Sequence, residues 1–125
     1  MAIDQLLHFA VKHGISDVHL RAGRPAYFRR DGNLVTRKGS GTLSEEQLMR
    51  WFTEMAGERN QGTFVRLAEV DFGYSLKGAG RFRVNAFRER GSMAMVLRHI
   101  PAEPPRLEEL GLPEVLAELA LSPRG

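Results

Sequence analysis

The stretch Gly80–Ile100, with the sequence GRFRVNAFRERGSMAMVLRHI, decides the fold. Apolar and polar residues alternate in its two halves, as they do in β-strands with one buried face. Arg90-Gly91 lies midway between the halves, and a two-residue turn there pairs Arg83 with Arg98. Directly opposed residues of a hairpin point to the same side of the sheet. The sequence therefore predicts a hairpin that sets two arginines face to face.

The two faces of this predicted hairpin differ in chemistry. We expect one face to be core, formed by Phe82, Val84, Ala86, Met93, Met95 and Leu97. Arg81, Arg83, Asn85 and Arg98 share the other face. Two guanidiniums repel each other, and neither loses its proton near neutral pH. An anion or a partner's carboxylate is therefore expected between Arg83 and Arg98, with an ordinary solvated sheet face as the alternative.

Length and composition are those of one globular domain. The chain has 125 residues, of which 42% are hydrophobic and 26% charged, and it has no cysteine. This length allows a substantial core, and the lack of cysteine excludes disulfides and thiolate metal sites. No apolar run approaches the roughly 20 residues of a membrane helix, and residues 1–4 lack the features of a signal peptide. We therefore expect a cytoplasmic protein without a membrane span.

Charge and motifs exclude several classes of site. Fifteen of the 18 basic side chains are arginine, which suits bidentate contacts to phosphate or carboxylate, although a genome-level arginine bias is an alternative. Acidic residues are dispersed among the arginines, so no dense nucleic-acid-binding tract is present. The four histidines lack the spacing of metal ligands. Neither a nucleophile motif nor a phosphate-binding loop occurs, so we expect no catalytic residue and no metal site.

Periodicity and turn residues predict the remaining elements. They are helices over 3–14, 44–57, 58–67 and 113–120, and strands over 16–20, 26–30, 33–36 and 70–76. Asp31-Gly32 is the predicted turn of the second hairpin, and Ser44 with Gln47 predicts a helix-capping box. This order favours an α+β domain over 1–100, with a mainly antiparallel sheet and helices on one face, and an appended linker and helix over 101–125.

Several segments match one known family. They are Ser16–Pro25 (SDVHLRAGRP), Arg30–Gly32 (RDG), Asp71–Tyr74 (DFGY), Gly80–Phe87 (GRFRVNAF) and Leu107–Pro113 (LEELGLP). Together they resemble the type IV pilus retraction ATPases, the PilT type of the secretion ATPase superfamily, from Ile15 to Gly125. The resemblance implies a PAS-like fold. It also implies a full-length hexameric ring that hydrolyses ATP with magnesium to retract pili in twitching motility, at the inner-membrane base of the pilus machinery.

The resemblance also implies which residues act. In the family, a run like Pro123-Arg124-Gly125 leads into the Walker A phosphate loop, so we expect an isolated amino-terminal domain without ATPase activity of its own. Two arginines fifteen residues apart, Arg83 and Arg98 here, are implied to reach nucleotide phosphates on the motor domain, and Arg81 is a further candidate. The expected partners are that motor domain and neighbouring subunits.

Two other functions remain open alongside this regulatory and assembly role. One is a PAS-like sensor of a small ligand, and the other is a nucleic-acid-binding module, which predicts salt-sensitive affinity for single-stranded DNA. The sequence does not separate the retraction ATPase from its close paralogue.

Overall fold

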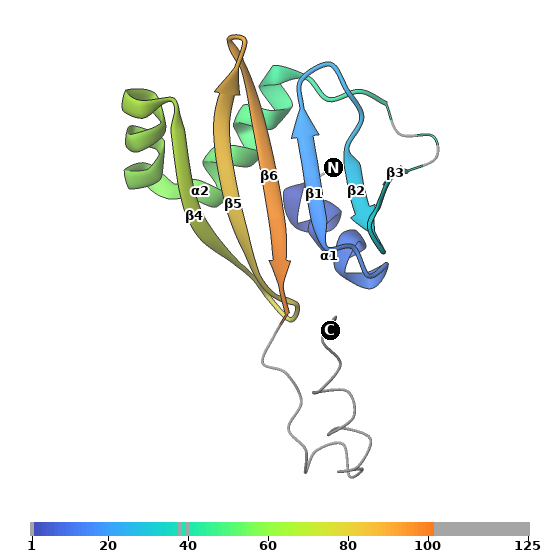
Figure 1. Ribbon diagram of the computed structural model, residues 1–125. Helices are drawn as coiled ribbons and strands as arrows, with labels where there is room; N and C mark the ends of the chain where they lie inside the picture. Colours follow the sequence, from blue (N-terminus) through green and yellow to red (C-terminus); the bar gives the residue numbers. More distant parts are fainter. Residues whose placement is uncertain (1, 38, 40, 102–125) are drawn as a thin grey trace.

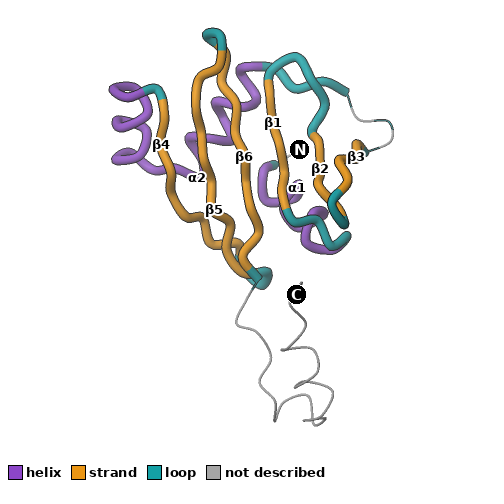
Figure 2. The backbone as a smooth tube through the Cα atoms, viewed as in Figure 1, coloured by secondary structure: helices purple, strands orange, loops and turns teal. Residues whose placement is uncertain are grey.

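A six-stranded antiparallel sheet organises the structure. In the computed structural model, which describes residues 2–37, 39 and 41–101, the strand order is β3-β2-β1-β6-β5-β4. The strands are β1 (Asp17–Arg21), β2 (Tyr27–Arg30), β3 (Asn33–Thr36), β4 (Glu69–Leu76), β5 (Gly80–Glu89) and β6 (Ser92–Ile100). Figures 1 and 2 show α1 (Ile3–Lys12) and α2 (Glu45–Leu67) together on one face of this sheet. The predicted fold class is confirmed, and the arrangement is compatible with the PAS-like label.

The β5–β6 hairpin has the register that the sequence predicts. Arg83 lies opposite Arg98, and Glu89 lies opposite Ser92. The turn residues Arg90 and Gly91 have φ values of 55° and 83°. Positive φ at both positions gives a turn whose twist matches that of the flanking strands. The turn between β2 and β3, at Asp31-Gly32, has the same property, with φ values of 51° and 84°.

The core lies between the sheet and the two helices. The six side chains predicted for the buried hairpin face are each at most 1% exposed. They belong to one apolar cluster with Leu7 of α1 and Phe52 of α2. Burying a large apolar side chain contributes about 1.5–3 kcal/mol, so this cluster fixes which sheet face is covered. The opposite face carries charged and polar side chains together with some apolar ones.

Gly57 divides α2 into two helical segments. Its φ of 78° and ψ of 169° are not helical, and this region of backbone conformation belongs almost entirely to glycine. The break confirms the expectation of two successive helices. The first segment begins at Ser44, whose Oγ accepts a hydrogen bond from the Gln47 backbone N–H at 3.1 Å, as the capping pattern predicts.

The pairing of β1 with β6 joins the two halves of the sheet, and no local sequence signal predicted it. In this register Asp17 lies opposite Arg98. Within residues 2–37, 39 and 41–101, no helix combines the length and the hydropathy that crossing a bilayer requires. The expected helix over 113–120, like all of 102–125, lies outside the described residues.

Two glycines of α2 provide a matched test of this backbone. Gly57→Ala places a Cβ at positive φ and should lower the free energy of unfolding by about 1–3 kcal/mol. Gly62 is a helical position where an added Cβ meets nothing within 4 Å. Gly62→Ala should therefore raise the free energy of unfolding by about 0.5–1 kcal/mol. Urea unfolding of both variants measures the two changes, and a stabilising Gly57→Ala would contradict the break in α2.

Candidate functional site

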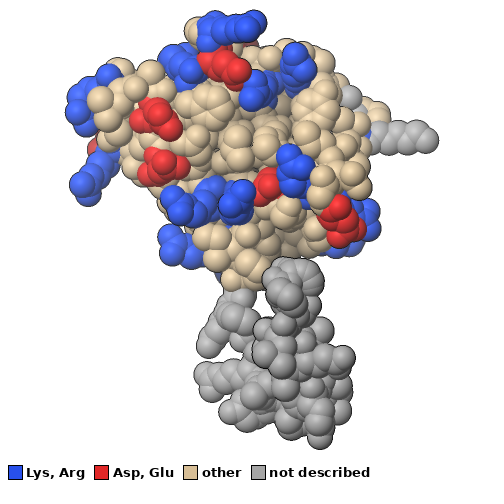
Figure 3. Space-filling view, viewed as in Figure 1, with Lys and Arg blue, Asp and Glu red and all other residues tan. Residues whose placement is uncertain are grey.

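The sheet face turned away from α1 and α2, which we call the open face, carries most of the candidate residues. Its charged side chains, together with His19 and Asn85, are Asp17, Arg21, Arg29, Glu69, Asp71, Arg81, Arg83, Glu89 and Arg98. Figure 3 shows acidic side chains in contact with basic ones at several places on this face, and two acidic groups on the left that stand apart from the basic ones. The alternation of the strands produces this face, because successive residues of a strand point to opposite sides of the sheet.

Four charged residues stand in one line across the sheet, and we call them the charged row. Strand register places Arg83 opposite Arg98, Arg98 opposite Asp17, and Asp17 opposite Arg29. The row therefore holds three guanidiniums and one carboxylate on four adjacent strands. Opposed residues on one sheet face are close enough for their side chains to interact.

Asp17 is the buried charged residue of the described chain, at 7% exposure. Its Oδ1 accepts a hydrogen bond from Arg98 Nε at 3.1 Å, and its Oδ2 lies 3.4 Å from Arg29 Nε. The Arg98 side chain nevertheless remains 71% exposed. The sequence did not predict this ion pair, because Asp17 and Arg98 are 81 residues apart in the chain.

Arg83 differs from Arg98 in its surroundings. Its side chain is exposed, and no carboxylate in the described part of the chain forms an ion pair with it. A hollow of about 280 Å³ adjoins Arg83 and is also lined by Asp71, Gly73, Arg81 and Ile100. Gly73 admits the Arg81 guanidinium, because a Cβ at this position would collide with it. The structure thus brings Arg81 and Arg83 to one hollow, next to Arg98.

The acidic residues of β4 share one hydrogen-bond partner on the open face. Asn85 Nδ2 donates to Asp71 Oδ1 at 3.1 Å and to Glu69 Oε2 at 3.2 Å. Arg21 forms an ion pair with Glu89 near the β5–β6 turn. An amide donor leaves the charge of a carboxylate in place, so Glu69 and Asp71 stay negative, and Asp71 also lines the hollow beside Arg81 and Arg83.

His19 lies on the open face between the charged row and Arg21. Its Nε2 atom is buried and has no hydrogen-bond partner within the described residues. Burial lowers the pKa of His19 below 6.5; Arg29, Arg21 and Arg98 lower it further, and Asp17 opposes them. His19 is therefore mostly neutral at pH 7, and the charge of the open face comes from arginines.

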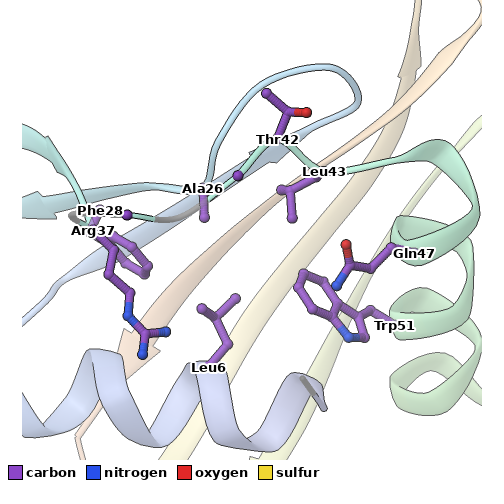
Figure 4. A pocket seen from close by; sticks show the side chains of 10 residues that line it. Leu6, Ala26, Phe28, Arg37, Thr42, Leu43, Gln47 and Trp51 are labelled. Atoms are coloured by element: carbon purple, nitrogen blue, oxygen red, sulfur yellow. The ribbon is translucent and has the colours of Figure 1, made fainter.

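A cavity of about 350 Å³ lies on the helix side of the sheet. Figure 4 shows Leu6, Phe28, Leu43 and Trp51 around it, with the Arg37 guanidinium and the Gln47 amide as its polar groups. The sequence reasoning expected the apolar face to be filled by core side chains and did not predict this space. The cavity is separated from the charged row by the sheet itself.

No residue cluster for a metal ion is found at either place. Among residues 2–37, 39 and 41–101, no group of three or more His, Asp or Glu side chains is arranged to hold one.

Comparison with known proteins gives consistent matches, although no protein-family model matches the chain. Over 125 residues the chain is 37% identical to the type IV pilus retraction ATPase PilT and 38% identical to the type IV pilus ATPase PilU, both of Pseudomonas aeruginosa. The alignments cover 36% and 32% of those proteins, so the chain spans about a third of their length. A crystal structure of the pilus retraction motor PilT with bound ADP matches 95% of this chain and 35% of its own chain, with a TM-score of 0.78 and 35% identity.

The buried imidazole predicts a pH dependence of stability. Because the folded-state pKa of His19 lies below its unfolded value of 6.5, the unfolded chain binds a proton first as the pH falls. Stability is therefore lost below about pH 6.5, down to the folded-state pKa. Urea unfolding between pH 7.5 and pH 5 should show a smaller loss for His19→Gln than for the wild type. His8→Gln, at an exposed position of α1, should match the wild type; a wild-type loss in His19→Gln would contradict the assignment.

Proposed function

The chain is homologous to the amino-terminal region of the type IV pilus ATPases PilT and PilU, and on that premise we propose that it is the regulatory and assembly domain of an ATPase motor that drives type IV pilus retraction. In this proposal Arg83 and Arg98, with Arg81 beside them, contact the phosphates of ATP bound to the motor domain of a parent protein. The observation that carries the proposal is the charged row, in which three guanidiniums and one carboxylate stand in line.

The charge balance of the row favours a phosphate ligand. The three guanidiniums and one carboxylate of the row have a net charge of +2, and the exposed Arg83 and Arg98 stand at the side of the row next to the hollow. Guanidiniums form short, charge-assisted and often bidentate hydrogen bonds with phosphate oxygens. A nucleotide carried by another domain would supply the negative charge that the described residues do not provide.

These arginines would act on the transferred phosphoryl group without forming a covalent bond. Guanidiniums that face the β- and γ-phosphates neutralise charge that develops during phosphoryl transfer. Loss of the γ-phosphate removes a charge-assisted contact and releases the domain from the motor, which couples hydrolysis to a rigid-body movement. ATP and its magnesium ion belong to the motor domain in this proposal, and this chain contributes cations only.

The proposal also names partners. The open face would meet a motor domain within a hexameric ring, on the cytoplasmic side of the inner membrane at the base of the pilus machinery. Glu69 and Asp71 on the same face oppose binding to nucleic acid. The similarities to PilT and PilU are nearly equal, so retraction motor and paralogue are equally consistent with the sequence comparison.

Substitution of the two arginines in the parent protein tests this function. Arg83→Ala and Arg98→Ala should each lower ATPase turnover by about tenfold or more, because each removes a charge from the phosphates in the transition state. Arg50→Ala is the matched control, since Arg50 is an exposed arginine on α2, on the other side of the sheet. All three variants should keep the circular dichroism spectrum of the wild type. Wild-type turnover in both Arg83→Ala and Arg98→Ala would overturn the proposal.

A small-ligand sensor is the second candidate function, and the cavity on the helix side favours it. Trp51 is the single tryptophan of the chain, lines this cavity and is 2% exposed, so its fluorescence reports binding there. The sensor function predicts saturable quenching of Trp51 by 8-anilinonaphthalene-1-sulfonate, which has an apolar body and one anionic group. Ala26→Leu fills part of the cavity and should weaken that binding by about tenfold or more. Equal binding to both proteins would exclude the cavity as the site.

A further inference from the structure

Asp17 occupies an unusual place in the charged row. It is the single carboxylate of the row and is almost fully buried, whereas its partner Arg98 is mostly exposed. Strand register fixes it between Arg98 on β6 and Arg29 on β2. A buried carboxylate is stable only where charged or hydrogen-bonding partners compensate for the loss of its hydration. Asp17 therefore requires its contacts with Arg98 and Arg29.

The two oxygens of Asp17 are divided between its two partners. Oδ2 faces Arg29, which is held a second time because its Nη1 donates to the Gly32 carbonyl at 3.1 Å. Oδ1 accepts the Nε–H of Arg98. Arg29 therefore anchors the carboxylate from one side, and the carboxylate in turn holds Arg98.

The contact with Arg98 leaves the outer part of that guanidinium available. Within the described part of the chain, Arg98 forms its side-chain hydrogen bond through Nε and none through its two Nη groups. A guanidinium has five N–H donors, so four remain at the two Nη atoms. A planar edge of this kind is the geometry that recognises two oxygens of one phosphate.

We propose that Asp17 is the positioning residue for Arg98: it holds the guanidinium by Nε so that both Nη groups face the phosphates of a nucleoside triphosphate on the motor domain. This inference rests on the proposed function of Arg98. Asp17 does not touch the nucleotide. It reduces the number of orientations that an exposed arginine adopts.

Asp17 holds Arg98 but not Arg83, so the proposal predicts different results when Asp17 is substituted together with one or the other arginine. Since Asp17 acts through Arg98 alone, the effects of substituting these two residues should not be additive. Substitutions at Asp17 and Arg83 should be independent, because no ion pair joins these two residues.

The test is a set of double-mutant cycles in the parent protein, with kcat/KM for ATP as the measured quantity. Asp17→Asn should lower kcat/KM by about tenfold. In an Arg98→Ala background the same change should have almost no further effect, whereas in an Arg83→Ala background it should keep its full tenfold effect. A merely structural role of Asp17 would lower kcat/KM in both backgrounds alike.

Arg98→Lys tests the same geometry if Asp17→Asn does not fold. A lysine keeps the charge, but its one ammonium group cannot bind Asp17 side-on and still present a planar edge to the phosphates. Arg98→Lys should therefore lose about as much kcat/KM as Arg98→Ala; wild-type kcat/KM in Arg98→Lys would overturn the proposal.

The outcomes distinguish this inference from the function on which it rests. Wild-type kcat/KM in Asp17→Asn together with an impaired Arg98→Ala overturns the positioning role and leaves the proposed function standing. An equal loss from Asp17→Asn in the presence and absence of Arg98 also overturns the positioning role. Wild-type kcat/KM in both Arg83→Ala and Arg98→Ala overturns the proposed function itself.

Discussion

The antiparallel pairing of β1 with β6 is the constraint on which the rest of the structure depends. It joins β1, β2 and β3 to β4, β5 and β6, and so makes one sheet from two three-stranded units. The same pairing directs the apolar faces of both units toward α1 and α2 (Figure 1). Its register also brings Asp17 beside Arg98. A shift of the register by one residue would turn one of these two side chains toward the core.

The charged row follows from this register and explains how an exposed cluster of arginines coexists with a stable sheet. Asp17 compensates Arg98 and Arg29 at one end of the row, while Arg83 and Arg81 adjoin a hollow at the other. The ion pairs of the row therefore centre on the buried Asp17, whereas the exposed Arg83 has no ion-pair partner among the described residues. Such a surface is suited to an anionic ligand held by another domain, because no carboxylate of the described residues forms an ion pair with Arg83.

The sequence allowed much of the fold to be predicted and less of the site. Arg90-Gly91 set the hairpin register, and alternation identified the buried face, because both signals are local. Gly57 marked the break in α2 for the same reason. The ion pair of Asp17 depends on two strands distant in sequence, and the cavity beside Trp51 depends on how a loop and two helices leave space between them. Neither arrangement has a local signature, so neither was predicted.

The central claim is that the charged row is completed by nucleotide phosphate. A structure of the parent protein with a non-hydrolysable ATP analogue and magnesium tests this claim most directly. The account predicts guanidinium nitrogens of Arg83 and Arg98 within about 2.7–3.2 Å of β- or γ-phosphate oxygens, with Asp17 still bound to Arg98 Nε. A bound nucleotide without any contact to Arg83 or Arg98, both facing solvent or a protein carboxylate instead, would contradict it.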